Sequence, residues 1–305
     1  MVDRNDAKKK AQEIIHTHYL NKITVEYPIG HYYSPYPNFA FIKKRYESLV
    51  NHQQKSIAGV NLNLEAQLAL ADELKQYQSC IPFPDKPQPE FRYYLDNGWF
   101  SYTDACVLFG MLRHRPPKRI IEVGSGYSSA LMLDTNEHFL NNDIELVFIE
   151  PDPYRLHEIF KENDRKKHKL IQLQLQDVEL EMFDKLNSGD WLFIDSSHVT
   201  KFGSDVNRIF FEILPRLKPG VMIHFHDVYW PFENPKDWLL HGRLWNEVYL
   251  LRGFLQYNTA FSICFFNAML DTLYPEIMRE TFPLSVHDEK YEITAAGSSI
   301  WLRKN

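Results

Sequence analysis

Cysteine is scarce in this chain, and so are long apolar runs and clustered positive charge. Three cysteines among 305 residues, Cys80, Cys106 and Cys264, form neither a disulfide framework nor a spaced zinc site. No uninterrupted apolar stretch reaches the roughly 18 residues of a membrane-spanning helix, and the first residues lack the apolar core of a signal peptide. The net charge of −6 argues against nonspecific nucleic-acid binding, which needs a basic field. We therefore expect a globular, cytoplasmic protein with neither a membrane nor a nucleic acid as partner.

Glycine is sparse too, but two glycines stand one residue apart in the segment Arg119-Ile-Ile-Glu-Val-Gly-Ser-Gly-Tyr-Ser-Ser129. This pattern is typical of a buried strand that turns sharply into a helix beneath a ligand. The third glycine of a dinucleotide fingerprint is missing, since Ser129 occupies its place, and no Gly-Lys-Ser/Thr phosphate loop follows. Glu122 favours a cationic or hydroxyl-rich ligand instead. The alternative interpretation is a turn that serves packing only.

A second acid follows the next strand. The β-rich run 144–149 ends at Glu150, 28 residues after Glu122, a span that fits one strand–helix–strand unit. An acid at the tip of the second strand is placed to accept both hydrogen bonds of a ribose diol. A solvated acid at a strand end is the alternative. Together with the glycine turn, Glu150 favours the ribose interpretation.

At this point the chain resembles the class I S-adenosylmethionine-dependent methyltransferases over roughly residues 92–302. The motifs that carry the resemblance occur in the family's order and spacing: Glu122-Val-Gly-Ser-Gly126, Glu150, Gln176-Asp177-Val178, Phe193-Ile-Asp195 and Leu217-Lys-Pro-Gly220. The resemblance implies S-adenosyl-L-methionine as the cofactor. It says little about the methyl acceptor.

The resemblance also assigns roles to single residues. Gly124 and Gly126 would pass under the methionine part of the cofactor, and Glu122 would lie near its ammonium or sulfonium end. Glu150 would hold the ribose hydroxyls, and Asp177 would accept from the adenine amino group beside the Val178 backbone. Further expected cofactor contacts are Ser128, Asp195 and Tyr102.

Alternating strand and helix signals from residue 118 onward predict an α/β fold. The expected strands are residues 119–123, 145–149, 170–174, 191–195, 221–226, 260–266 and 298–302. Such alternation gives a mostly parallel sheet with helices on both faces, and its ligands bind at the carboxyl ends of the strands. The resemblance makes this a Rossmann-like, seven-stranded sheet whose last strand is antiparallel.

The first ninety residues lie outside the resemblance. We expect two domains: an N-terminal extension, 1–90, and a cofactor-binding domain, 91–305. Within the extension, residues 3–20 and 62–78 indicate helices, and the Tyr- and Pro-rich segment 27–37 indicates an extended arm without strand structure. Either this arm folds over the cofactor as a lid, through Tyr32, Tyr33, Ser34 and Tyr36, or it only packs on the domain. A third helix is expected over residues 100–114.

The candidate catalytic groups follow the fourth and fifth strands. Asp195 and His198 end one strand segment, and His226 and Asp227 end the next. Adjacent parallel strands lie about 4.8 Å apart, so these side chains are expected to converge. Strand alternation places His224 and His226 on the same face. His224, deeper in the strand, is expected to serve packing.

Two chemistries fit this group of side chains. Asp195, His226 and Asp227 partly resemble the ligand set of metal-dependent O-methyltransferases of this fold, with a histidine in place of one carboxylate or amide. That change suits a softer divalent ion better than magnesium. Without a metal, His198 or His226 is expected to act as a general base, assisted by Asp195 or Asp227.

The acceptor is expected to be a small molecule, methylated at oxygen. The aromatic loop 229–235 and the segment with Arg243 and Glu247 are candidates for the acceptor site, although these two residues also fit a surface ion pair four positions apart. Two other classes stay open: an enzyme that uses S-adenosylmethionine without transferring methyl, such as a cyclase, and a noncatalytic binding protein. A homodimer is also left open.

Overall fold

The computed structural model describes residues 26–285 and 297–305, and these divide into two compact units. The larger unit contains Val50–Pro235 and Trp245–Asn305. The smaller unit contains the described residues up to Leu49 together with Lys236–Leu244. The division therefore falls at Leu49 and not at the predicted boundary near residue 90. The helix expected over residues 3–20 lies outside the described residues.

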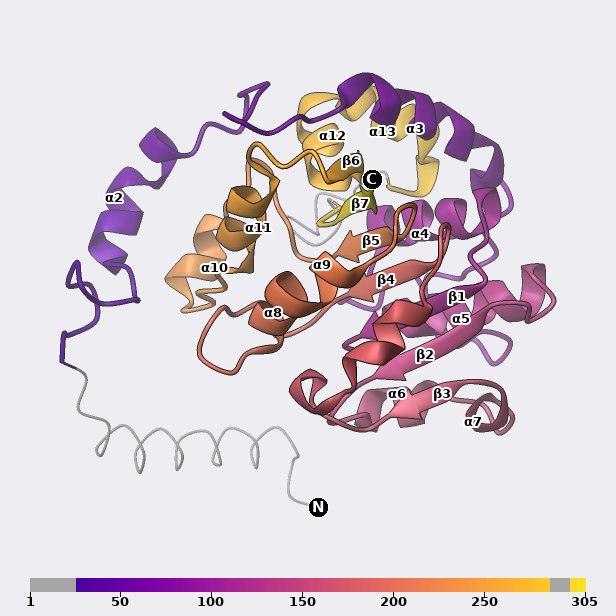
Figure 1. The fold of residues 1–305 in the computed structure, drawn as a ribbon. Helices are drawn as coiled ribbons and strands as arrows, with labels where there is room; N and C mark the ends of the chain where they lie inside the picture. Colours follow the sequence, from indigo (N-terminus) through magenta and orange to yellow (C-terminus); the bar gives the residue numbers. More distant parts are fainter. Residues whose placement is uncertain (1–25, 286–296) are drawn as a thin grey trace, which may run out of the picture. The chain divides into compact units, whose positions relative to one another are not determined.

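The larger unit is built on a seven-stranded sheet in the order β3-β2-β1-β4-β5-β7-β6 (Figure 1). The first five strands pair in parallel, while β7 is antiparallel to both β5 and β6, which confirms the predicted Rossmann-like class. The strands are β1 (Arg119–Val123), β2 (Glu145–Ile149), β3 (Lys169–Ile171), β4 (Trp191–Ile194), β5 (Met222–Phe225), β6 (Phe261–Phe266) and β7 (Ile300–Lys304).

The strand boundaries deviate most from prediction at β3, an edge strand, and at β7, which lies between β5 and β6. β3 ends at Ile171, three residues early, because it pairs only with β2 and only over three positions. β7 begins two residues later than expected, at Ile300, and runs to Lys304. The central strands are largely buried on both faces, so their sequences are mostly apolar, with Glu122 in β1 and His224 in β5 as buried polar exceptions.

Helices cover both faces of the sheet, with α4 and α5 on one face and α8 and α9 on the other (Figure 1). The helices of the larger unit are α3 (Leu64–Gln78), α4 (Tyr102–His114), α5 (Tyr127–Phe139), α6 (Tyr154–Ile159), α7 (Asp164–Lys167), α8 (Asp205–Arg208), α9 (Leu214–Arg216), α11 (Glu247–Leu255), α12 (Asn267–Leu273) and α13 (Pro275–Thr281). Short 3-10 turns are η1 (Leu175–Asp177), η2 (Leu180–Lys185) and η4 (Pro283–Ser285), and η3 (Ile209–Ile213) is a π-helical turn between α8 and α9.

Residues 50–90 belong to the larger unit because α3 packs on α4 and β6. Leu74 of α3 is fully buried, and the side chain of Gln67 accepts a hydrogen bond from the backbone N–H of Phe266 in β6 at 2.7 Å. Arg92 follows, buried between the carboxylates of Asp134 (2.6 Å) and Asp164 (2.8 Å). These long-range contacts extend the fold well upstream of the first strand.

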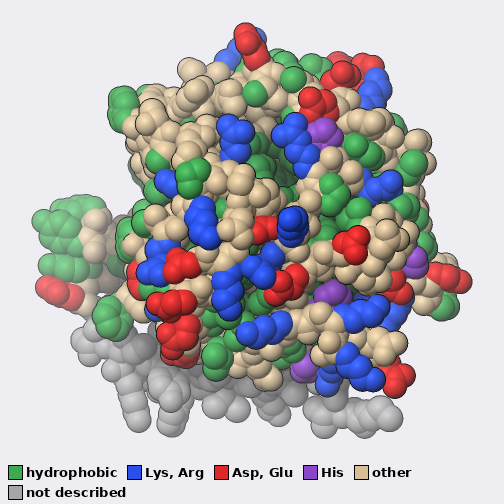
Figure 2. Space-filling model, turned by 45° about the vertical axis from the view of Figure 1, so that its right-hand side comes forward, with side chains coloured by type: hydrophobic (Ala, Val, Ile, Leu, Met, Phe, Trp, Pro, Cys, Tyr) green, Lys and Arg blue, Asp and Glu red, His purple; other side chains and the backbone are tan. Residues whose placement is uncertain are grey.

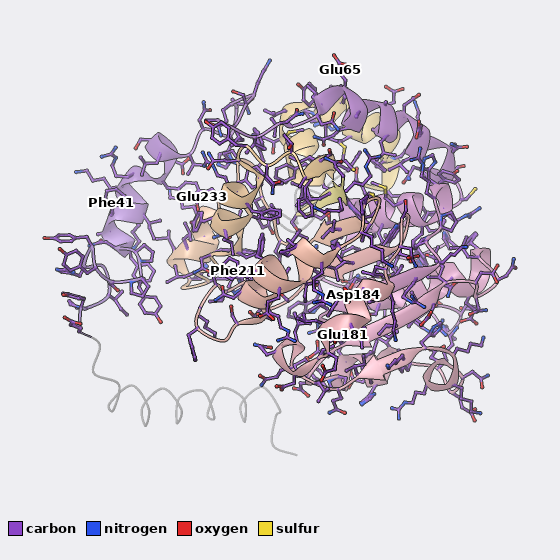
Figure 3. All side chains as sticks on the ribbon, in the orientation of Figure 1. Phe41, Glu65, Glu181, Asp184, Phe211 and Glu233 are labelled. Atoms are coloured by element: carbon purple, nitrogen blue, oxygen red, sulfur yellow. The ribbon has the colours of Figure 1, made fainter. Side chains whose placement is uncertain are left out.

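The smaller unit contains α2 (Phe39–Leu49) and α10 (Lys236–Leu240), which are joined by an ion pair of 2.8 Å between Lys236 Nζ and Glu47. Phe41, labelled in Figure 3, is an exposed residue of α2. The segment 27–37 has no strand, as expected, but the prediction of an extended arm is wrong. It folds into successive turns, with Gly30 at φ +85° and the rings of Tyr27 and His31 stacked at 4.9 Å.

Among the described residues, the helices lack the combination of length and hydropathy that crossing a bilayer requires.

Candidate functional site

The turn after β1 depends on one glycine. Gly124 has φ +78°, and a Cβ at this position would come within 1.8 Å of the backbone oxygen of Asp195, at the end of the neighbouring strand β4. Only glycine fits such a close approach of two strand ends. Gly126 lies in an extended conformation, and a Cβ there would meet only the flexible Arg155 side chain at 3.2 Å. The two glycines of the motif are therefore required to different degrees.

Glu122 is fully buried beneath this turn. Its carboxylate accepts hydrogen bonds from the hydroxyls of Ser128 (2.6 Å) and Ser129, both in the first turn of α5. Burial raises the pKa of Glu122 to about 8, and the two serine hydroxyls offset only part of that rise. The structure thus places Glu122 as a buried support of the helix that follows the glycine turn.

A cavity of about 470 Å³ opens at the carboxyl ends of β1, β2 and β4. Its lining includes Gly124, Glu150 and Asp195, three residues that the sequence predicted as cofactor contacts. The Glu150 carboxylate is held in place by the backbone N–H groups of Ser125 (3.1 Å) and Asp152 (2.9 Å). The cavity therefore has a fixed carboxylate at the tip of β2, where a ribose contact was expected.

The other predicted cofactor residues do not line the cavity: Glu122, Gly126, Ser128, Asp177, Val178 and Tyr102. Asp177 is exposed at the end of η1, Val178 is buried, and the hydroxyl of Tyr102 donates to Asp85 at 3.2 Å. Gln174, Leu175 and Gln176 line the cavity on this side instead. Sequence reasoning missed Gln174 and Leu175, because the position of η1 against the cavity depends on where the short edge strand β3 ends.

Asp195, His198 and Asp227 converge beside the cavity. His198 Nε2 lies 3.3 Å from Asp195 Oδ1 and 3.7 Å from Asp227 Oδ2. His198 and Asp227 both have positive φ, +59° and +56°, a backbone conformation that costs free energy in residues other than glycine. The loops after β4 and β5 are therefore bent at the residues whose side chains meet, as the adjacency of the two strands predicted.

Glu247 is the residue that sequence reasoning misread. It was considered as one half of a surface ion pair with Arg243, but its side chain is buried and its Oε2 lies 2.9 Å from His198 Nδ1. The N-terminus of α11 also fixes the backbone of the His198 loop, since the N–H groups of Asn246 and Glu247 both donate to the carbonyl oxygen of His198 at 3.1 Å. A spacing of 49 residues between His198 and Glu247 offers no sequence signal for this pair.

The pKa values within this cluster diverge. Burial opposes the charge on His198, but hydrogen bonds to Asp195 and Glu247 outweigh it and hold the pKa of the imidazole well above its usual range. Burial would raise the pKa of Asp195, yet His226 and His198 bring it down to about 2. The pKa values of Asp227 and Glu247 are raised by burial. Three acids thus surround one imidazole, and the cluster favours a bound positive charge.

His224 and His226 lie on the same face of β5, as strand alternation predicted, with ring centroids 5.9 Å apart. His224 stacks on Phe193 at 3.8 Å, and burial lowers its pKa well below the usual value, so it packs as a neutral ring. His226 lies nearer the cluster, with Nε2 3.9 Å from Asp227 Oδ1. Burial opposes the charge on His226, but Asp227 and Asp195 raise its pKa.

The residues present fit a divalent metal ion. One ligand atom each from Asp195, His198 and Asp227 lies within 4.8 Å of the others. Two of these three were predicted as ligands, while His198 occupies the place expected for His226. Two carboxylates and one imidazole suit Fe²⁺ or Zn²⁺, and also Mn²⁺, better than Mg²⁺. The contact of Glu247 with the other ring nitrogen of His198 is the arrangement that orients a ligating histidine.

The aromatic loop 229–235, a candidate for the acceptor site, packs largely into the core. Trp230 and Phe232 are buried against Phe266, with ring centroids 5.8 and 5.1 Å away. Glu233, labelled in Figure 3, accepts a hydrogen bond from the hydroxyl of Tyr249 in α11. The loop therefore anchors α11, the helix that carries Glu247, and the expectation that its buried aromatic rings wall a pocket is wrong.

Parts of this chain match known proteins. A family model described as "Methyltransferase domain" matches residues 121–228. An uncharacterized protein of Archaeoglobus fulgidus is 35% identical over 166 residues, which is 52% of this chain and 73% of that protein.

Similar solved structures are a Podospora anserina methyltransferase with bound S-adenosylhomocysteine and a putative methyltransferase of Thermobifida fusca. The first has 16% identity, covers 93% of this chain and 100% of its own, and has a TM-score of 0.43. The second has 13% identity, covers 78% of this chain and 87% of its own, and has a TM-score of 0.44.

Proposed function

We propose that this chain is a class I S-adenosylmethionine-dependent methyltransferase that transfers the cofactor's methyl group to an oxygen atom of a small molecule. One observation carries the proposal: Asp195 lines the cavity at the carboxyl edge of the sheet and also pairs with His198. The cavity where the cofactor would bind and the candidate base therefore share a side chain. This is the proximity that a direct displacement requires.

The cavity supports a sulfonium nucleoside as its ligand. Glu150 offers a carboxylate to the ribose hydroxyls, and Gly124 leaves room for the methionine part. Among the described residues, the charged side chains in the lining are the acids Glu150, Asp195 and Asp205 and the cation Lys201, so the cavity favours a cationic ligand over one with several phosphates.

His198 would act as the general base. Bound S-adenosylmethionine would supply the methyl group to the acceptor oxygen, and the acceptor's hydroxyl proton would pass to His198 Nε2. Glu247 holds the proton on Nδ1, which leaves Nε2 as the basic nitrogen facing Asp195 and Asp227. A sulfonium cation beside Asp195 would compete with His198 for that carboxylate. Cofactor binding would therefore lower the pKa of the imidazole towards the neutral range.

The test combines binding with turnover. Calorimetry with S-adenosylmethionine establishes the cofactor, and release of S-adenosylhomocysteine from a panel of hydroxylated small molecules identifies acceptors. With an acceptor in hand, His198→Gln is expected to lower turnover by about 100-fold or more while cofactor affinity changes little. His157→Gln is the matched control, because His157 lies on α6 beside Arg165, away from the cluster. Equal turnover in the His198 and His157 variants would contradict the proposed base.

A metal ion is the second candidate for the same cluster. Asp195, His198 and Asp227 would hold it, and a divalent ion there would lower the pKa of an acceptor hydroxyl. Titration of the purified protein with Mn²⁺, followed by electron paramagnetic resonance, tests this candidate without an acceptor. Tight binding that Asp227→Asn weakens would support the metal, and an unchanged free-ion signal would exclude Mn²⁺ at this cluster.

Product analysis with the cofactor alone separates methyl transfer from the other chemistries. A cyclase would consume the cofactor without any acceptor and release methylthioadenosine. A noncatalytic protein would bind S-adenosylmethionine and return it unchanged under every acceptor tested.

A further inference from the structure

A second cavity lies at the opposite edge of the sheet, where the strands begin. Its volume is about 570 Å³, larger than the cavity beside Asp195 and within the roughly 300–1,000 Å³ typical of small-molecule sites. It is lined by the starts of β4 and β5, the end of β7, β6, and the C-terminal end of α4. Figure 2, which brings forward the right-hand side of Figure 1, shows an apolar hollow between Lys and Arg side chains on this side of the molecule.

The wall of this cavity is apolar. Strand pairing sets Trp191 beside Met222, and Leu70 and Met111 approach from α3 and α4. The thiol of Cys264, half-buried in β6, completes it. These side chains form a surface suited to an aliphatic or aromatic group, because burying apolar area is the main source of affinity in such a site.

The rim of the same cavity is cationic. Arg115, Arg303 and Lys304 line it together with Cys264. Burial raises the pKa of the Cys264 thiol to about 11, an effect that the positive charges of Arg303 and Arg115 partly offset. The nearby carboxylate of Glu73 lies 3.0 Å from His114 and 3.9 Å from Arg115. Within residues 26–285 and 297–305, Arg303 has no carboxylate within 4.0 Å, which leaves its charge available to a ligand.

We propose that this cavity binds a small amphipathic carboxylate, with the apolar body against Trp191, Met222 and Cys264 and the carboxylate between Arg115 and Arg303. A guanidinium group matches a carboxylate through two parallel hydrogen bonds, which gives selectivity for the anion over a neutral analogue. The site does not depend on methyl transfer. Its occupant would touch the first residues of β4 and β5, the strands whose other ends carry Asp195 and Asp227.

Calorimetry with octanoate as the probe tests the proposal, with octanamide as its neutral analogue. Wild-type protein is expected to bind octanoate, and the double variant Arg115→Gln/Arg303→Gln is expected to bind it at least about tenfold more weakly, as the loss of charge-assisted hydrogen bonds predicts. Arg216→Gln/Arg279→Gln is the matched control, because both arginines are ion-paired on other surfaces. Equal affinity of the two double variants, equal affinity for octanamide, or no octanoate binding would overturn the proposal.

Cysteine alkylation locates the ligand. Octanoate is expected to slow the reaction of Cys264 with N-ethylmaleimide, measured by peptide mass spectrometry, while the exposed Cys80 reacts at an unchanged rate and serves as an internal reference. The same slowing at both cysteines would place the probe elsewhere and would count against the cavity.

Discussion

Replacing Glu122 by Gln tests the buried acid beneath the glycine turn. Glu122 is fully buried, and its hydrogen-bond partners are Ser128 and Ser129. Its pKa rises from 4.5 to about 8 because burial disfavours the charged carboxylate. Glutamine keeps the shape and one hydrogen-bond acceptor but cannot ionise. The variant therefore isolates the effect of the charge on folding.

The sign of the effect follows from the proton balance. Between pH 4.5 and about 8 the folded protein holds a proton on Glu122 that the unfolded chain has released, so stability falls as the pH rises through this range. Each tenfold change in proton affinity corresponds to about 1.4 kcal/mol, which gives an upper limit of about 5 kcal/mol. The glutamine variant does not lose this stability as the pH rises. Relative to the wild type, it is expected to gain roughly 3–4 kcal/mol between pH 5 and pH 8.

The assay is urea unfolding of both proteins at several pH values, followed by circular dichroism. Other titrating groups affect both proteins alike, so the difference in unfolding free energy reports on Glu122. If that difference stayed constant from pH 5 to pH 8, the carboxylate would be charged in the folded protein and the structural reasoning would be refuted. Calorimetry adds a second readout: because Glu122 does not line the cavity, we expect S-adenosylmethionine affinity to change by less than about fivefold.

Three further outcomes can be measured on the purified protein. Gly124→Ala is expected to destabilise the fold by about 3 kcal/mol or more in urea unfolding, because the new Cβ would lie 1.8 Å from a backbone atom, whereas Gly126→Ala is tolerated. Equal losses of unfolding free energy in the two variants would contradict the difference between the two positions. Glu150→Ala is expected to weaken S-adenosylmethionine binding at least about tenfold in calorimetry, and Asp177→Ala is expected to weaken it much less, because of these two residues only Glu150 lines the cavity. A larger loss of affinity in the Asp177 variant would disprove the assignment of this cavity to the cofactor. Arg92→Met is expected to cost about 3–5 kcal/mol of unfolding free energy, because it leaves the buried carboxylates of Asp134 and Asp164 without their partner. A loss below about 1 kcal/mol would show that these ion pairs are solvated.

The sheet could be predicted from the sequence because its central strands are buried on both faces. In residues 119–123 and 145–149 every position after the first is buried, and all of these positions except Glu122 are apolar, so pattern and structure largely coincide. The boundaries of β3 and β7 were less predictable. β3 and β7 differ from their expected ranges because pairing with a single neighbour or a bulged partner determines where each strand ends.

The candidate site could be predicted in part. Asp195, His198 and Asp227 follow adjacent strands, so the rules of parallel sheets bring them together. Glu247 could not be found in this way, because its role depends on how α11 packs on the His198 loop through backbone contacts. A charged residue type also does not tell whether its side chain is buried. Glu122 was expected to face the cofactor, but both of its carboxylate oxygens accept hydrogen bonds from serine hydroxyls of the next helix.

The packing of α3 on β6 affects how this protein can be shortened. A chain trimmed to start at residue 91 would keep every strand but lose the hydrogen bond from the Phe266 backbone to Gln67 and the cover that Leu74 provides. Apolar side chains beneath α3 would then face water and promote association between molecules. Expression for crystallography should therefore begin no later than Val50, where the larger unit starts.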